Sequence, residues 1–186
     1  MRDFHLPGRS AVFATNGLCA TSHPLGAKTA INILERGGNA MDAAIAGAVI
    51  LGFCEPAMTG IGGDCFVLWS HGGQNDVRAL NASGRAPAAQ DAAKLREAGE
   101  TIVPVFSAQA VTIPTAIAGF AHLSENVGKL GLDALLAPSI HYAEEGIPVA
   151  PRVAFDWANY AHNLQGAGRK HFLHNDAAPK VGELFR

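Results

Sequence analysis

Residues 21–69, TSHPLGAKTAINILERGGNAMDAAIAGAVILGFCEPAMTGIGGDCFVLW, decide the fold of this chain. The first part predicts a helix, because apolar side chains recur at helical spacing between Leu25 and Leu34 and a glycine pair beginning at Gly37 ends the pattern. Ser22 is the expected N-cap, since its hydroxyl can accept a hydrogen bond from an unpaired backbone N–H of the first turn. The stretch therefore begins with a capped, amphipathic helix.

A second helix is predicted over residues 40–53, where Ala and Gly occupy all sides and no polar face exists. Such a helix is buried, and its small side chains let other elements approach closely. Asn39 is the expected N-cap, and Asp42 lies in the first turn, where the helix dipole favours a carboxylate. Residues 60–63, Gly-Ile-Gly-Gly, then predict a tight turn with positive φ, followed by an apolar strand over residues 65–69.

The composition is that of a globular protein without a nucleic-acid or membrane footprint. Among 186 residues, 48% are hydrophobic, and 14 basic side chains are balanced by 16 acidic ones with no basic run. Binding to nucleic acid or to an anionic membrane surface needs clustered Lys and Arg. The longest uncharged apolar run, residues 43–54, is too short to span a bilayer. We therefore expect no nucleic-acid partner and no membrane partner.

The start of the chain and its cysteine content indicate a reducing compartment. Residues 1–8 lack the apolar core of a secretory signal. The three cysteines, at positions 19, 54 and 65, leave at least one thiol unpaired, and their spacing is not that of a metal site. We expect a cytoplasmic protein.

Further along the chain, strand patterns mix with long helical patterns. Three strands are predicted in addition to the one over residues 65–69, and they cover residues 11–20, 77–82 and 109–113. All four are expected to form one sheet. Helices are predicted over residues 115–127, 132–145 and 151–163, with a short exposed helix around residues 91–97. This mixture gives an α+β class. Because no linker or internal repeat is visible, residues 1–186 are interpreted as part of a single domain.

The glycine-rich turn does not predict a nucleotide site. Phosphate-cradling loops run from a strand through glycines into a helix, whose N-terminus faces the phosphate. In this chain a helix precedes the glycines and a strand follows them, and no Gly-Lys-Ser/Thr is present. We expect no cofactor.

Arg85 and Ser83 are the candidate substrate-binding residues. Arg85 follows the strand predicted over residues 77–82, and its planar guanidinium can bind a carboxylate through two parallel hydrogen bonds. If the segment is extended, residues 83 and 85 point to the same face, roughly 6.5 Å apart along the strand. The alternative is a solvated arginine at a strand end, and the residues alone favour neither interpretation.

Other reactive side chains indicate structural roles. Ser22 and His23 are neighbours in sequence, and neighbouring side chains rarely converge as a catalytic pair. Cys65 has no recognisable base nearby, so we expect a buried structural thiol. No catalytic residue is assigned on this basis.

Two groups of histidines were considered as metal ligands. His141 lies one helical turn from Glu144 and Glu145, and His171 and His174 form a second near pair. Metal sites on helices need more converging ligands than either group offers. We expect no metal site.

Several segments, taken in order, resemble the gamma-glutamyltransferase family of N-terminal-nucleophile hydrolases. They are the block over residues 21–64, Val-Thr-Ile-Pro at 111–114, Leu-Leu-Ala-Pro-Ser-Ile at 135–140 and Ala-Glu-Glu-Gly-Ile-Pro-Val at 143–149. Each piece alone is weak, but their order and spacing together are specific. The Ser-Gly-Arg-Ala-Pro variant at 83–87 is similar to the branch that lacks a signal peptide and includes non-glutathione amidohydrolases.

The resemblance implies a layered αββα sandwich that is incomplete, with residues 1–186 as the N-terminal large-subunit portion. Family members cut themselves to expose an N-terminal threonine, whose α-amine acts as the base for its own hydroxyl. No threonine of this chain has the family's cleavage context, which implies that the nucleophile lies in a missing C-terminal (small) subunit. In typical members an arginine two positions before Arg85 holds the substrate's α-carboxylate, and this chain has Ser83 there.

The resemblance therefore implies a gamma-glutamyltransferase or glutathione hydrolase-like amidohydrolase that acts on a small-molecule amide in glutathione metabolism. The isolated chain is expected to be inactive, with the missing subunit of the same precursor as its partner. Two alternatives stay open. One is an amidohydrolase acting on a non-glutathione amide, such as a small oxo-acid amide. The other is a catalytically inert fragment that acts only by association.

Overall fold

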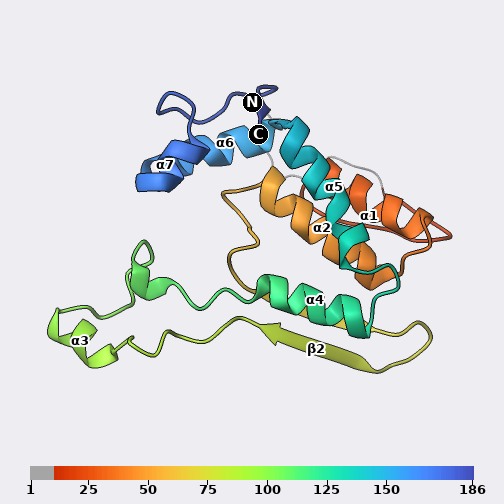
Figure 1. Cartoon of the computed structure of the whole chain (residues 1–186), viewed down its shortest axis with the longest axis horizontal. Helices are drawn as coiled ribbons and strands as arrows, with labels where there is room; N and C mark the ends of the chain where they lie inside the picture. Colours follow the sequence, from red (N-terminus) through yellow and green to blue (C-terminus); the bar gives the residue numbers. More distant parts are fainter. Residues whose placement is uncertain (1–10) are drawn as a thin grey trace.

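A computed structural model describes residues 11–186, which form a group of packed helices, a β-hairpin and a short C-terminal segment of helices (Figure 1). The elements, in chain order, are α1 (Pro24–Glu35), α2 (Ala40–Cys54), β1 (Cys65–Ser70), β2 (Val77–Ala82), α3 (Ala92–Glu97), the 3₁₀ turn η1 (Ala108–Ala110), α4 (Ala116–Asn126), α5 (Leu132–Glu145), β3 (Ile147–Pro148), α6 (Pro151–Tyr160), the 3₁₀ turn η2 (Ala161–Asn163), α7 (Gly166–Phe172) and β4 (Leu184–Phe185).

The helical core packs α1 and α5 against α2 (Figure 1). Small residues allow this close approach, because a β-carbon built on Gly26 of α1 would lie 2.9 Å from Leu51 Cδ2 of α2. Most of α2 is buried, including Ile45, Ala46 and Ile50, which confirms the prediction made from its lack of a polar face. Burial of one side chain such as Ile45 contributes about 2 kcal/mol.

A reciprocal cap fixes the N-terminus of α2. Asn39 Oδ1 accepts the Asp42 N–H at 3.0 Å, which confirms Asn39 as the N-cap, and Asp42 Oδ2 accepts the Asn39 N–H at 2.9 Å from the first turn, a return bond that was not predicted. Asp42 is fully buried and also accepts the Lys129 N–H at 2.9 Å, while Asn39 Nδ2 donates to Val127 O. The same two side chains therefore also hold the turn between α4 and α5.

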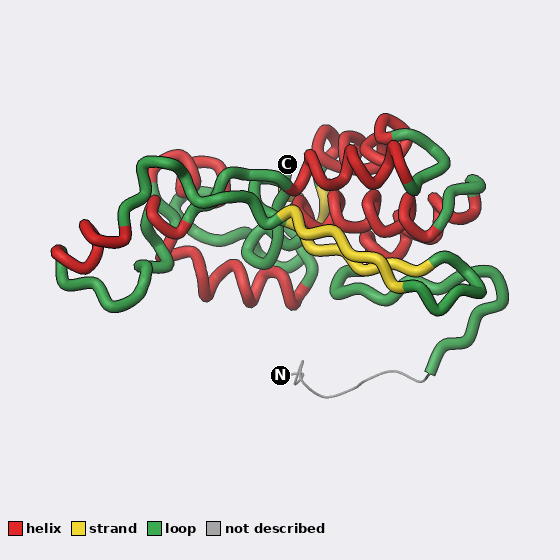
Figure 2. Tube along the Cα trace, turned by 90° about the horizontal axis from the view of Figure 1, so that it is seen from below, coloured by secondary structure: helices red, strands yellow, loops and turns green. Residues whose placement is uncertain are grey.

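The hairpin of β1 and β2 is antiparallel, with Cys65 opposite Ala82 and Ser70 opposite Val77. Helix α4 lies along it (Figure 1), so close that a β-carbon on Gly119 would approach Cys65 Sγ to 2.8 Å. Figure 2 shows the hairpin as a narrow two-stranded ribbon beside the helices. Between β2 and α4 the chain makes a long irregular excursion that carries α3 away from the core (Figure 1).

The predicted four-stranded sheet is wrong. Residues 11–20 contain no strand, and residues 109–113 begin inside η1 and continue as irregular chain. A strand is stable only with a partner, and the strands that the structure describes pair as two separate two-stranded sheets, β1 with β2 and β3 with β4. The α+β class is confirmed, whereas a layered sandwich is not formed by the described residues alone.

The predicted late helices are confirmed, with small shifts at their ends. They correspond to α4, α5 and α6, and the short exposed helix corresponds to α3. Helix α6 ends at Tyr160 and tightens into η2, so the prediction of one continuous helix to residue 163 is too long. Beyond it, Phe185 of β4 packs edge-on against Trp157 with ring centroids 4.7 Å apart, which ties the end of the described chain to α6.

Candidate substrate-binding site

Arg85 and Ser83 lie in irregular chain just after β2, which ends at Ala82. Gly84 between them has φ +72°, a left-handed conformation that glycine adopts readily. The condition under which both side chains would lie on one face, an extended segment, is therefore not met, because a positive φ turns the chain. Arg85 is exposed and Ser83 half-buried. Within the described residues, the Arg85 guanidinium makes no ion pair with a carboxylate.

The segment preceding α4 holds this turn in place. Three backbone carbonyls around Gly84 accept hydrogen bonds from it: Ala82 O from Thr115 Oγ1 (2.6 Å), Ser83 O from Thr112 Oγ1 (3.0 Å) and Arg85 O from Ile113 N (3.0 Å). Two of the three donors are side-chain hydroxyls, so the segment does not form the regular ladder of a strand. Sequence reasoning missed both threonines, because each contacts a carbonyl about thirty residues away and nothing local signals the pairing.

The glycine-rich turn meets the same segment, since Gly63 O accepts the N–H groups of Thr115 and Ala116, both at 3.0 Å. Its glycines do not have positive φ, so that prediction is wrong. A β-carbon on Gly60 or Gly62 would find no neighbour within 4 Å among the described residues. The turn, the end of β2 and the start of α4 therefore converge, and the glycine backbone at this junction is bare on its outer side.

Cys65 lies beside this junction, with Sγ 3.9 Å from Ala116 O. Partial burial, and then the charge of Asp64, raise the pKa of the thiol. A raised pKa reduces the thiolate fraction at neutral pH, and the thiolate is the form that acts as a nucleophile. The environment of Cys65 therefore supports the structural role expected from sequence.

Ser22 does not cap α1, contrary to the prediction. His23 is the N-cap, because its Nδ1 accepts the Leu25 N–H at 3.1 Å, whereas Ser22 Oγ donates to Glu55 Oε2 at 2.5 Å. An imidazole nitrogen can take the place of the cap hydroxyl, and the distant carboxylate of Glu55 draws the serine away. Ser22 and His23 have different partners, so they do not form a catalytic pair.

His23 should make the stability of the chain depend on pH. Burial lowers its pKa below the usual 6.5, and the charge of Glu55 opposes this only in part. As pH falls below about 6.5, the unfolded state therefore takes up a proton before the folded state does. The contribution of His23 to stability is present above that pH and is lost below it.

The check is denaturant unfolding at a series of pH values between about 7.5 and about 5, on either side of the ordinary histidine pKa. His23→Asn retains a side-chain acceptor for the cap but cannot titrate, so its unfolding free energy should fall less steeply with decreasing pH. An identical slope in the two proteins would assign the pH dependence to other groups.

The histidines considered as metal ligands do not assemble. His174 Nδ1 pairs with Glu183 Oε1 at 2.9 Å and not with His171. The hydrogen bonds from Lys180 N and from His174 lower the pKa of Glu183. Within residues 11–186 no group of three or more potential ligands comes together. That part of the chain also contains no helix with the length and apolar character needed to cross a membrane.

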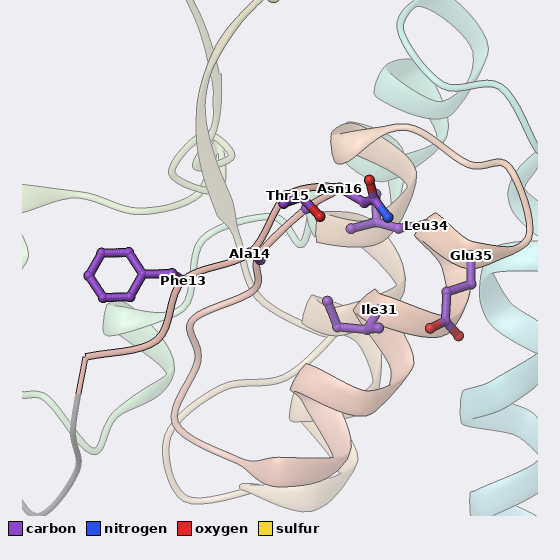
Figure 3. Close-up of a pocket in the computed structure, with 8 residues that line it drawn as sticks. Phe13, Ala14, Thr15, Asn16, Ile31, Leu34 and Glu35 are labelled. Carbon is purple, nitrogen blue, oxygen red and sulfur yellow. The ribbon is translucent and has the colours of Figure 1, made fainter.

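A cavity of about 660 Å³ lies between residues 13–17 and α1 (Figure 3). Ile31 and Leu34 form part of its wall, and Phe13 projects at its edge. Its polar lining side chains are Thr15, Asn16 and Glu35. With one carboxylate and no histidine, lysine or cysteine, the lining lacks the paired acid and base or the activated nucleophile of a catalytic site.

Comparison with curated proteins identifies relatives along nearly the whole chain. The family model described as gamma-glutamyltranspeptidase matches residues 26–186. The chain is 31% identical over 175 residues to the glutathione hydrolase proenzyme of Bacillus subtilis. This alignment covers 91% of this chain and 30% of that protein. It is 33% identical over 186 residues to the oxamate amidohydrolase proenzyme of Klebsiella pneumoniae, with coverage of 95% and 34%. The chain thus spans about a third of the length of these relatives.

Solved structures show the same arrangement of elements. Cephalosporin acylase from Bacillus halodurans matches with a TM-score of 0.86 at 38% identity, over 99% of this chain and 36% of that one. The gamma-glutamyltranspeptidase of Helicobacter pylori matches with a TM-score of 0.86 at 27% identity, over 95% and 52%. These findings confirm the resemblance carried by the sequence motifs: the chain belongs to the gamma-glutamyltranspeptidase family.

Proposed function

We propose that this chain is the N-terminal portion of an amidohydrolase, in which it binds the substrate and the remainder of the protein supplies the nucleophile. Its relatives bear the names of glutathione hydrolases, an oxamate amidohydrolase and acylases, and it spans about a third of their length. The state of the side chains at the junction also supports a nucleophile that lies outside this chain. Cys65 has a raised pKa, and the hydroxyls of Thr112 and Thr115 are committed to backbone carbonyls.

The position of Arg85 is the observation that carries this proposal. Its side chain is exposed at the end of β2, while its backbone carbonyl is held by Ile113 N. A guanidinium on a fixed backbone can receive a carboxylate through two parallel hydrogen bonds and so orient the rest of the substrate. A gamma-glutamyl group and oxamate both carry a free carboxylate on the acyl side of the amide, so one arginine suits either.

The two candidate substrates are a gamma-glutamyl amide and, second, a small oxo-acid amide, and they are distinguished by the carboxylate-binding residues. Relatives of similar identity bear names of both kinds. The presence of Ser83 where typical members have their arginine favours the second, because the guanidinium of Arg85 then approaches from two residues further along the chain. In the third possibility, an inert fragment that only associates, substitution of Arg85 would not affect substrate binding.

The partner in this proposal is the remainder of the same precursor, packed against the hairpin and the glycine turn. Phe66 and Leu68 on the outer face of β1 are 67% and 75% exposed, and Val77 on β2 is 67% exposed. Large apolar side chains gathered on one face indicate a surface that another protein segment covers. Gly60 and Gly62, where an added β-carbon would meet no neighbour within 4 Å among the described residues, precede the same strand. Completion of the αββα sandwich by that partner is part of the proposal.

A cytoplasmic location is also part of the proposal. Cys19, Cys54 and Cys65 are free thiols. Burial, together with the charge of Glu55, raises the pKa of Cys54 to about 12, so this thiol stays protonated and unreactive. Unpaired cysteines suit a reducing compartment.

Arg85→Lys should raise the KM of the complete enzyme for its carboxylate-bearing donor by about tenfold, because lysine keeps the charge but loses the planar fork. Ser83→Ala is the matched control and should change KM less than about twofold, since the backbone groups of Ser83 are already bound by Thr112 and Asn81. The assay uses gamma-glutamyl anilide and oxamate as alternative donors. Equal small effects of both substitutions would identify Arg85 as a solvated surface residue.

A further inference from the structure

Thr115 stands at the N-cap position of α4 but does not cap the helix. A threonine there ordinarily accepts a hydrogen bond from the first turn, whereas the Thr115 side chain makes no such bond. Its hydroxyl instead donates to Ala82 O at 2.6 Å, across 33 residues of sequence. The Thr115 hydroxyl therefore serves a tertiary contact to the end of β2 in place of the local cap.

Thr115 also joins the other two segments of the junction. Its backbone N–H donates to Gly63 O at 3.0 Å in the glycine turn. Its Oγ1 lies so near Gly84 that a β-carbon there would approach it to 3.3 Å. One half-buried residue thus contacts the end of β2, the turn that carries Arg85 and the glycine turn at the same time.

Thr112 provides a contrast within the same segment. It makes the same kind of bond, from Oγ1 to Ser83 O at 3.0 Å, but the pair is exposed to solvent. Water can replace an exposed hydrogen bond at little cost, whereas a partly buried carbonyl that loses its donor is left without a partner. Of the two hydroxyl donors, Thr115 therefore contributes more to fixing the backbone that leads into Arg85, whose own carbonyl is bound by Ile113 N.

We propose that Thr115 is the positioning residue for Arg85, which sets the direction from which the guanidinium meets the substrate carboxylate. This rests on the function proposed above for Arg85. Without the Thr115 hydroxyl, Ala82 O loses its donor and the turn around Gly84 gains freedom, so the guanidinium samples more positions. Fixing the guanidinium in one position when the substrate binds then costs free energy, so the affinity for the carboxylate falls. The reacting groups, which the remainder of the precursor supplies, are unchanged.

The test uses the complete precursor and whichever of gamma-glutamyl anilide and oxamate the wild-type protein hydrolyses. Thr115→Val keeps the shape of the side chain and removes the hydroxyl. It should raise KM by about tenfold with kcat changed less than about twofold, as expected for lost substrate binding. Thr115→Ser should restore the wild-type KM, and Thr112→Val should leave it within about twofold.

A purely structural role for Thr115 has a different signature, because partial unfolding lowers the apparent kcat through loss of active enzyme and leaves KM unchanged. That outcome, or an unchanged KM in Thr115→Val, would overturn the inference. If Arg85→Lys raises KM and Thr115→Val does not, the positioning role fails while the proposed function stands. If the wild-type protein hydrolyses neither donor, or Arg85→Lys has no effect, the proposed function fails and this inference fails with it.

Discussion

Asp42→Ala is expected to lower the free energy of unfolding of the chain by about 4 kcal/mol, because it leaves partly buried backbone N–H groups from two segments without an acceptor. The carboxylate is fully buried and accepts the N–H groups of Asn39 and Lys129, both at 2.9 Å. Alanine cannot replace either bond. Denaturant unfolding followed by circular dichroism measures the loss directly.

Asp91→Ala is the matched control for this substitution. Asp91 also caps a helix, α3, by accepting the Ala93 N–H at 2.8 Å, but that pair is exposed. Its loss should cost about 0.5 to 1 kcal/mol, the ordinary value for an N-cap. Equal destabilisation by the two alanines would mean that Asp42 acts only as a cap and does not hold the turn between α4 and α5.

Gly84→Ala is expected to disrupt the candidate binding site more severely than any other single methyl addition near it. A β-carbon at this position would lie 2.0 Å from Ile113 O, and the φ of +72° is already unfavourable for alanine. A backbone carbonyl cannot rotate away, so the bond from Ile113 N to Arg85 O has to break or shift. We expect a loss of about 3 kcal/mol in stability and about a hundredfold in kcat/KM for the complete enzyme.

Gly99→Ala is the control that separates the steric clash with Ile113 O from the cost of a positive φ. Gly99 has φ +84°, but a β-carbon there would meet no neighbour within 4 Å among the described residues. Gly99→Ala should therefore lower the free energy of unfolding only by the strain of alanine in a left-handed conformation, about 1 to 2 kcal/mol, and leave kcat/KM unchanged. If Gly84→Ala behaves like Gly99→Ala in both measurements, the close fit of Gly84 against Ile113 does not position Arg85.

Helices were predictable from sequence where neighbouring residues determine the structure. Asn39 and Asp42 form the expected cap because both partners lie within one turn, and the glycine pair at residues 37–38 ends α1 as expected. Burial of α2 followed from its composition alone. The hairpin strands were also found, because alternating or continuous apolar residues are bounded by a glycine turn.

Features that depend on distant partners were not predictable. Residues 11–20 have the composition of a strand, yet strand formation requires a partner that local sequence does not reveal. Ser22 has the chemistry of a cap, but Glu55 takes its hydroxyl and leaves the cap to His23. In both cases the local preference is a fraction of a kcal/mol to about 1 kcal/mol, and one tertiary contact outweighs it.

In the candidate site, too, local features could be predicted from sequence and features that depend on distant residues could not. Arg85 could be singled out by residue type and by its place after a strand. Its geometry could not, because the positive φ of Gly84 follows from the fit against Ile113, and the hydroxyl bond from Thr115 spans 33 residues. The glycines at residues 60, 62 and 63 were predicted to have positive φ, yet none of them does, because the conformation of the turn depends on its contacts with the start of α4.

Hydrolysis of gamma-glutamyl anilide and oxamate by the 186-residue chain alone, and by the same chain produced with the remainder of its precursor, tests the central claim most directly. We expect no turnover by the chain alone and turnover by the complete protein, with KM raised in Arg85→Lys. Turnover by the chain alone that survives purification and disappears in Cys65→Ala or Ser22→Ala would contradict it, because the nucleophile would then lie within these residues.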